Sequence, residues 1–158
     1  MVIKLKVPEP QKLYPERKIN GRVQCGKVCP ACSFIKTEKS LKIDRNTKWK
    51  LNRKLSCQDY NIIYSISCDK KGCLENKYIG ETGRSLKTRL VDHCDYVRNQ
   101  HTDQATGAHF NQPGHSLANM KITILEQVKT NDMAYRKERE HYFINTFNTF
   151  QEGMNKQS

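Results

Sequence analysis

The sequence predicts an α+β fold in which a small three-stranded antiparallel sheet is flanked by helices. Three short apolar runs have the composition of strands, and two longer segments repeat their apolar residues at helical intervals. The strands are predicted at 62–66, 78–80 and 120–126, and the helices at 85–98 and 131–147. With 158 residues, the chain is long enough for one domain with its own core and a small extension.

The first two predicted strands form a hairpin. Residues 62–66 are an apolar run with little alternation, which is typical of a buried strand. A polar turn follows, and residues 78–80 return as the antiparallel partner. Cys68 and Cys73 stand at the two ends of this turn, so the tip of the hairpin can offer sulfur ligands to a metal.

The predicted helix at 85–98 places two basic residues on its apolar face. Arg89 and His93 are four residues apart, so both side chains can reach one site. Because a lone buried charge is costly, Arg89 needs a partner or an anionic ligand; a surface salt bridge is the alternative. The same face carries Leu86, Leu90, Cys94 and Val97.

The second long helix, at 131–147, carries a glutamate on its apolar face. Asn131 is the expected N-cap. A carboxylate at Glu140 either incurs a desolvation penalty or holds a cation, and pairing with an arginine is the alternative. The neighbouring Glu138 points elsewhere. The apolar face is marked by Met133, Ile144 and Phe147.

Cysteine spacing predicts a first zinc site near the N-terminus. Cys25, Cys29 and Cys32 form a C-x3-C-x2-C cluster, which suits tetrahedral zinc. Cys57 is the nearest candidate for the fourth ligand; the alternatives are three free thiols, or a different fourth ligand such as Cys94 or a histidine.

We see no secretory signal and no run that approaches a membrane span, so we expect a soluble intracellular protein that contacts no membrane.

A second zinc site is predicted from two cysteines and two histidines. Cys68 and Cys73 are spaced C-x4-C, and His109 and His115 are spaced H-x5-H in a polar segment with a short helix near Gln104. About 35 residues separate the pairs, which fits a zinc that joins the hairpin to a loop packed across it. The alternative is that the two cysteines are ordinary buried thiols.

The net charge of +12 is concentrated in the first third of the chain. Residues 1–55 hold 15 Lys and Arg against 4 Asp and Glu, whereas residues 56–158 hold 13 against 12. A concentrated basic block predicts contact with a phosphate backbone; a solvated basic tail is the alternative. We expect an extended or mobile basic arm at 1–24 and a zinc-binding, DNA-contacting segment at 25–57.

Two short motifs and a following arginine resemble the GIY-YIG nuclease domain. The motifs are 62–64 (IIY, with Ile62 at the first glycine position) and 78–80 (YIG), followed by Arg89. The wider pattern is similar to the endonuclease domain of Penelope-like retroelements, and on that resemblance residues 58–158 are the nuclease domain with an inserted CCHH zinc site. The features matched are the cysteines between the motifs and the stretches 80–86 (GETGRSL), 106–110 (TGAHF) and 113–115 (PGH).

The resemblance implies an endonuclease that uses one Mg²⁺ or Mn²⁺. Glu140, four residues before Ile144, matches the metal-binding glutamate of the family. Arg89, rather than Arg84, matches the arginine that stabilises the transition state. Asn155 matches a C-terminal asparagine that braces the site.

The two tyrosines and the histidine complete the implied site. Tyr64 would accept the proton of the attacking water, alone or through a relay, and Tyr78 would orient the water or the phosphate. A phenol is a poor base at neutral pH, so Arg89 and the metal must favour its phenolate. His93 is a second candidate in the proton path.

The family's chemistry implies products with a 3′-hydroxyl and a 5′-phosphate, and the 3′-hydroxyl is the primer that a reverse transcriptase needs. The resemblance therefore implies DNA as substrate, a nuclear location, and the reverse transcriptase domain of the same polyprotein with its template RNA as partners. It also implies that the chain is the end of a longer reverse transcriptase. The alternatives are a zinc-dependent DNA-binding module without cleavage, a GIY-YIG repair or homing enzyme, and a zinc-stabilised protein-interaction domain.

Overall fold

The computed structural model places three antiparallel strands at the centre of the molecule. It describes residues 17–19, 22–25, 29, 31–36, 38–52 and 54–156. The strands are β5 (Ile62–Cys68), β6 (Lys77–Thr82) and β7 (Met120–Gln127), arranged in the order β6-β5-β7. The predicted fold class is confirmed, and each strand runs beyond its predicted bounds.

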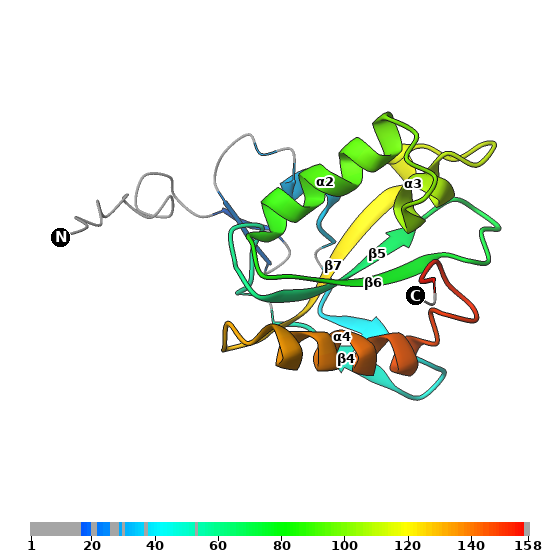
Figure 1. The fold of residues 1–158 in the computed structure, drawn as a ribbon. Coiled ribbons are helices and arrows are strands. Elements are labelled where there is room, and N and C mark those ends of the chain that lie inside the picture. The colour runs from blue at the N-terminus through cyan, green and yellow to red at the C-terminus, as the bar shows by residue number, and fades with distance from the viewer. Residues whose placement is uncertain are drawn as a thin grey trace.

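Alternation along β5 divides the core between the two faces of this sheet. Ile62, Tyr64 and Ile66 pack with the apolar face of α2 (Leu86–Arg98), which covers one face together with α3 (Ala105–Phe110). The next residue along, Ile63, belongs to a second cluster with α4 (Met133–Phe147) on the other face. Figure 1 shows α2 and α3 on one side of the sheet and α4 on the other. Because Tyr64 faces α2, its hydroxyl can meet the polar residues of that helix.

Capping residues set the ends of the long helices. The side chain of Ser85 accepts a hydrogen bond from the backbone N–H of Thr88 and caps α2, which begins within one residue of its predicted start. At α4 the predicted N-cap is wrong, because Asp132, not Asn131, caps the helix with a charged acceptor. Asn131 instead accepts a hydrogen bond from the amide of Asn61 over 2.8 Å.

The start of α4 lies outside the core. Met133 is 64% exposed, so its predicted place on the buried face is wrong. It is the first residue of the helix, and the buried residues of α4 are Arg136, Phe143 and Ile144. The first buried residue of α4 is therefore Arg136, one turn after Met133, and its first buried apolar residue is Phe143.

A second hairpin, which the sequence analysis did not predict, packs behind α4. Its strands are β3 (Ser40–Lys42) and β4 (Lys48–Lys50). The indole N–H of Trp49 donates to the carbonyl of Leu125 over 2.8 Å, and its ring meets that of Phe143 edge-on at 4.8 Å. This hairpin (39–50) is therefore fixed to the same core that positions α4.

The rest of the N-terminal part contains short elements. Within the predicted arm, β1 (Arg17–Ile19) pairs antiparallel with β2 (Arg22–Gln24), and residues 1–16 lie outside the described residues. Two 3-10 turns, η1 (Cys32–Phe34) and η2 (Leu117–Asn119), complete the fold. In the part of the chain that the structure describes, no helix is long and apolar enough to cross a membrane.

Candidate active site

The hydroxyl group of Tyr64 lies at the centre of a buried hydrogen-bond network. Tyr64 is 0% exposed. Nε of Arg89 donates to its hydroxyl oxygen over 3.1 Å, and Nε2 of His93 lies 2.7 Å from the same oxygen. On the far side of the imidazole, Nδ1 of His93 lies 2.8 Å from Oγ1 of Thr106 on α3. Arg89 and His93 thus reach one site, as predicted, and Tyr64 is their common partner.

Burial keeps this network neutral at its centre. Burial raises the pKa of Tyr64 well above its ordinary value, and Tyr78 adds to the rise while Arg89 opposes it. Burial, followed by the charge of Arg89, lowers the pKa of His93 to about 3. The resting site therefore joins a neutral phenol to a neutral imidazole, and Arg89 by itself does not produce the expected phenolate.

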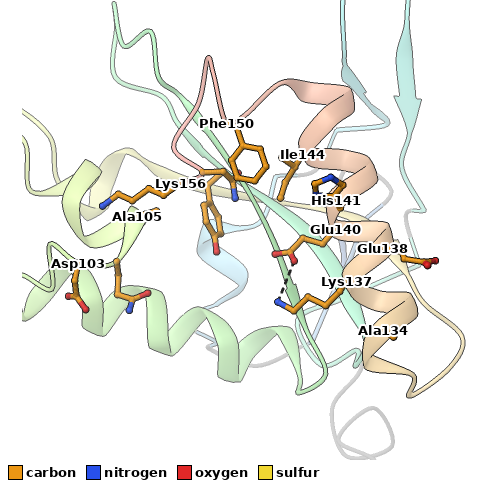
Figure 2. A pocket seen from close by; sticks show the side chains of 13 residues that line it. Asp103, Ala105, Ala134, Lys137, Glu138, Glu140, His141, Ile144, Phe150 and Lys156 are labelled. Atoms are coloured by element: carbon orange, nitrogen blue, oxygen red, sulfur yellow. Dashed lines mark hydrogen bonds and ion pairs between the residues drawn. The ribbon is translucent and has the colours of Figure 1, made fainter. Parts of the chain in front are cut away.

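Next to this network, beside the edge strand β6, lies an open cavity of about 750 Å³. Residues of the α3 region, α4 and the C-terminal segment line it (Figure 2). Tyr78, Glu140 and Asn155 are among its lining residues. Tyr78 also connects the cavity to the buried network, because its ring centroid lies 6.4 Å from that of Tyr64 and 5.5 Å from that of His93.

The carboxylate of Glu140 points into this cavity, whereas that of Glu138, which is also among the lining residues, points away from it, on the other side of α4 (Figure 2). Glu140 has a side chain only 17% exposed, and desolvation raises its pKa despite the nearby charge of Lys137. Nζ of Lys137 lies 3.4 Å from the carboxylate. Among the described residues Glu140 forms no ion pair with an arginine, which was the alternative, and the nearby Arg136 and Arg139 pair with Glu81 and Glu126.

Arg89 and Arg84 have different surroundings. Both pair with Asp92, but the side chain of Arg84 is 56% exposed and that of Arg89 is 23% exposed. Arg89 therefore forms a surface salt bridge with Asp92 and also donates a hydrogen bond to the buried phenol of Tyr64. Of the two arginines, it is the one that the fold directs toward the tyrosines.

Asn155 holds the edge strand through both groups of its amide. Its Oδ1 accepts from the backbone N–H of Ile79 over 2.8 Å, and its Nδ2 donates to the carbonyl of Ile79 over 2.9 Å. Ile79 follows Tyr78 directly, so these bonds fix the backbone beside the tyrosine that lines the cavity.

Gly80 permits the close packing of the two tyrosines. A Cβ atom there would lie 2.5 Å from the hydroxyl oxygen of Tyr64 and 2.8 Å from the ring of Tyr78. Any side chain would displace one of the rings, and this explains the glycine of the second motif. Ile62, at the position of the first glycine, is an ordinary buried strand residue.

The structure brings the four N-terminal cysteines together. The ligand atoms of Cys25, Cys29, Cys32 and Cys57 lie within 4.8 Å of one another, and three sulfur pairs are 3.5, 3.7 and 3.8 Å apart. Zn–S bonds of about 2.3 Å at tetrahedral angles separate sulfurs by about 3.8 Å. The donor set and its dimensions fit zinc. Cys94, the alternative ligand, is not part of this group.

The second predicted ligand set is also assembled. The ligand atoms of Cys68, Cys73, His109 and His115 lie within 4.8 Å of one another. Nδ1 of His115 donates to the carbonyl of Pro113 over 3.2 Å, which leaves Nε2 as the free lone pair, and this atom is buried without a hydrogen-bond partner. A buried Nε2 without a hydrogen-bond partner fits a metal ligand whose ring is oriented by the bond from Nδ1 to the carbonyl of Pro113. The seven cysteines, all of which are described, form no disulfide.

The surroundings of Glu140 fit a hard divalent cation. Magnesium is typically held by one or two carboxylates, with water and substrate phosphate completing its shell. Glu140 offers such oxygens in an open cavity, and among the described residues it belongs to no group of three or more protein ligands. A cation there would depend on water and substrate for most of its ligands.

Two neighbours of the site were missed from the sequence. Lys137 contacts Glu140 from one helical turn before it, and this i, i+3 spacing is a signal that could have shown it. Thr106 meets His93 across 13 positions of sequence between two helices, and no local pattern indicates such a contact.

In a comparison with protein families, the model of the GIY-YIG catalytic domain matches residues 60–155. No curated protein and no solved structure gives a significant match. The matched range contains both tyrosines, the arginine, the glutamate and the asparagine described above, and it covers more than half of the chain. The chain therefore belongs to the GIY-YIG family and carries a nuclease catalytic domain.

Proposed function

We propose that this domain nicks DNA by hydrolysis and leaves a 3′-hydroxyl and a 5′-phosphate. The observation that carries the proposal is the direct contact of Arg89 with Tyr64, at 3.1 Å, beside a cavity that holds the Glu140 carboxylate. The guanidinium of Arg89 on α2, the phenol of Tyr64 on β5 and the carboxylate of Glu140 on α4 can together surround one phosphodiester. Asn155 and Gly80 fix the strand on which this arrangement depends.

In the proposed step, the oxygen of a water molecule bonds to phosphorus and the bond from phosphorus to the 3′-oxygen breaks. The electron pair of the broken bond stays on the 3′-oxygen, which takes a proton from solvent. The attacking water gives a proton to the oxygen of Tyr64 while Tyr64 passes its own proton to Nε2 of His93, 2.7 Å away. Tyr78 orients the water from the wall of the cavity.

Arg89 controls access to Tyr64 in this proposal. Tyr64 is fully buried, and Arg89 lies against its hydroxyl with a side chain that is 23% exposed. When a phosphate enters, the guanidinium turns to it and neutralises the charge that builds on phosphorus. The same movement opens Tyr64 to the attacking water and takes away a positive charge that lowers the pKa of His93.

A Mg²⁺ or Mn²⁺ ion held by Glu140 would supply positive charge at a non-bridging phosphate oxygen and at the leaving oxygen. Lys137, 3.4 Å from the carboxylate, opposes the rise that burial causes in the pKa of Glu140 and adds a positive charge to the wall of the cavity. The two zinc clusters have structural roles in this proposal.

The hairpin 39–50 is a DNA contact in this proposal. Lys42 and Lys48 are directly opposite each other on its two strands, and both are exposed. Like charges in this position destabilise a hairpin, and a phosphate lying over them removes the repulsion. Leu41 and Trp49 occupy the other face and hold the hairpin against the core.

The assembled CCHH cluster supports a Penelope-like retroelement as the source of this domain. On this proposal the 3′-hydroxyl primes reverse transcription in the nucleus. The partners are then the reverse transcriptase domain of the same polyprotein and its template RNA.

The test is nicking of supercoiled plasmid with Mg²⁺ or Mn²⁺. Arg89→Ala is expected to lose nicking by about 100-fold or more, the usual effect of removing a transition-state donor. Arg84→Ala is the matched control, because it loses the same Asp92 partner and is expected to nick normally. The nicked product should be extended by a DNA polymerase, which needs a 3′-hydroxyl. DNA binding without nicking in any divalent metal would leave a zinc-dependent DNA-binding module instead.

A further inference from the structure

Thr106 of α3 is a buried hydroxyl residue with no part in the mechanism so far. It is 1% exposed, and its Oγ1 lies 2.8 Å from Nδ1 of His93. His93 is itself 2% exposed and meets Tyr64 through its other ring nitrogen. The imidazole is therefore held between two hydroxyl groups, and the proton positions on this chain decide what His93 can accept.

The proton positions follow from the guanidinium end of the chain. An arginine can only donate, so the 3.1 Å bond from Nε of Arg89 occupies a lone pair of the Tyr64 oxygen. Burial keeps Tyr64 a phenol, so its single proton needs an acceptor, and Nε2 of His93 is 2.7 Å away. Nε2 must then be without a proton. A neutral imidazole carries its proton on the other nitrogen, so Nδ1 donates to Oγ1 of Thr106.

We infer that Thr106 is a positioning residue that keeps the proton of His93 on Nδ1, so that Nε2 is free to take the proton of Tyr64. The choice of ring nitrogen in histidine is set by the bond that the other nitrogen makes. This inference rests on the proposed function for its consequence in catalysis. The proton arrangement itself stands on the buried contacts and on the neutral forms of Tyr64 and His93, and it can be measured without any nuclease activity.

The experiment compares Thr106→Val with Thr106→Ser in the full chain loaded with zinc. Valine has nearly the shape of threonine but lacks the acceptor, whereas serine keeps it. Long-range ¹H–¹⁵N correlation spectra report which ring nitrogen of His93 carries the proton, and backbone spectra confirm that each variant is folded. Single-turnover nicking rates are measured on the same samples.

The wild type and Thr106→Ser are expected to show an unprotonated Nε2. Thr106→Val is expected to show protonation of Nε2 in a substantial fraction of molecules and a nicking rate about tenfold lower, as for loss of the partner that orients a functional histidine. A protonated Nε2 in the wild type would overturn the inference, and so would a folded Thr106→Val variant with the wild-type proton position. If the wild type and Thr106→Val both show the expected spectra but the wild type does not nick, the proposed function fails and the assignment of Thr106 as the tautomer-fixing residue stands.

Discussion

The backbone N–H of Lys87 donates a hydrogen bond to the carbonyl of Cys57 over 2.7 Å. This bond joins the first turn of α2 to the four-cysteine cluster, two residues before Arg89. On α3, which covers the same face of the sheet as α2, His109 of the CCHH cluster lies three residues from Thr106. Each predicted zinc site thus supports a helix that carries a residue of the Tyr64 network.

Cys57→Ser is expected to remove one zinc ion per chain. Three thiolates then remain for a metal that needs four, so the free energy of unfolding should fall by about 4 kcal/mol or more, as for loss of a structural metal. Metal analysis and denaturant unfolding measure the two effects. Cys94→Ser is the matched control, because Cys94 is buried but belongs to neither cluster. An unchanged zinc content in Cys57→Ser would remove Cys57 from the site.

His115→Ala is expected to remove the other zinc ion and to weaken the contact between α3 and His93. The reason is that His109, the second histidine ligand, stands three residues from Thr106 on α3. Metal analysis should give one zinc in place of two, and the ring-nitrogen spectrum of His93 should become heterogeneous. His101→Ala, which changes an exposed histidine outside the cluster, should keep both zinc ions and the wild-type spectrum.

The double variant Lys42→Gln, Lys48→Gln is expected to bind DNA more weakly without loss of zinc or of stability. If both lysines contact phosphates, the slope of log affinity against log salt should become shallower by about 1.8, since each contact contributes about 0.9. Titrations at several salt concentrations measure this slope. A slope equal to that of the wild type would place the DNA elsewhere. Removing the repulsion between the two lysines should leave the free energy of unfolding equal or slightly higher.

Folding stability is expected to fall as the pH drops from about 6.5 to about 3 because of His93. The pKa of His93 is lowered from 6.5 to about 3 in the folded state, first by burial and then by Arg89. In this window the unfolded chain binds a proton that the folded chain excludes, so acid favours unfolding by up to about 1.4 kcal/mol per pH unit. Above pH 6.5 His93 is neutral in both the folded and the unfolded chain, so it adds no pH dependence to the free energy of unfolding. Urea unfolding across this range should give a flatter profile for His93→Gln than for the wild type, whereas His101→Gln should follow the wild type.

Local patterns predicted the sheet and the helices, because apolar periodicity is a property of short segments. The runs around Tyr64 and Tyr78 and the helix that carries Arg89 are examples. The zinc ligand sets were predicted for a similar reason, since close spacing places Cys68 near Cys73, and His109 near His115.

Contacts between distant segments were not predicted in the same way. The hairpin 39–50 is mostly lysine on one face, and each of its three-residue strands carries a single apolar residue, Leu41 or Trp49, which is too little for a strand pattern. The burial of Tyr64 depends on how Arg89 packs across it, and Thr106 reaches His93 only after α3 folds back on α2. Such relationships are set by tertiary packing.

In our proposal the cavity beside β6 is the site of metal-dependent cleavage. The variant Glu140→Gln is the most direct test of this assignment. The substitution keeps the shape of the side chain but removes the charge that would hold the cation, whereas Glu138→Gln makes the same change at a lining residue whose carboxylate points away from the cavity (Figure 2). The measurement is the single-turnover rate of plasmid nicking as Mn²⁺ is titrated. We expect Glu140→Gln to lose nicking by about 100-fold or more while it still binds DNA, and Glu138→Gln to nick as the wild type does. Equal nicking by Glu140→Gln and the wild type at every Mn²⁺ concentration would contradict the account.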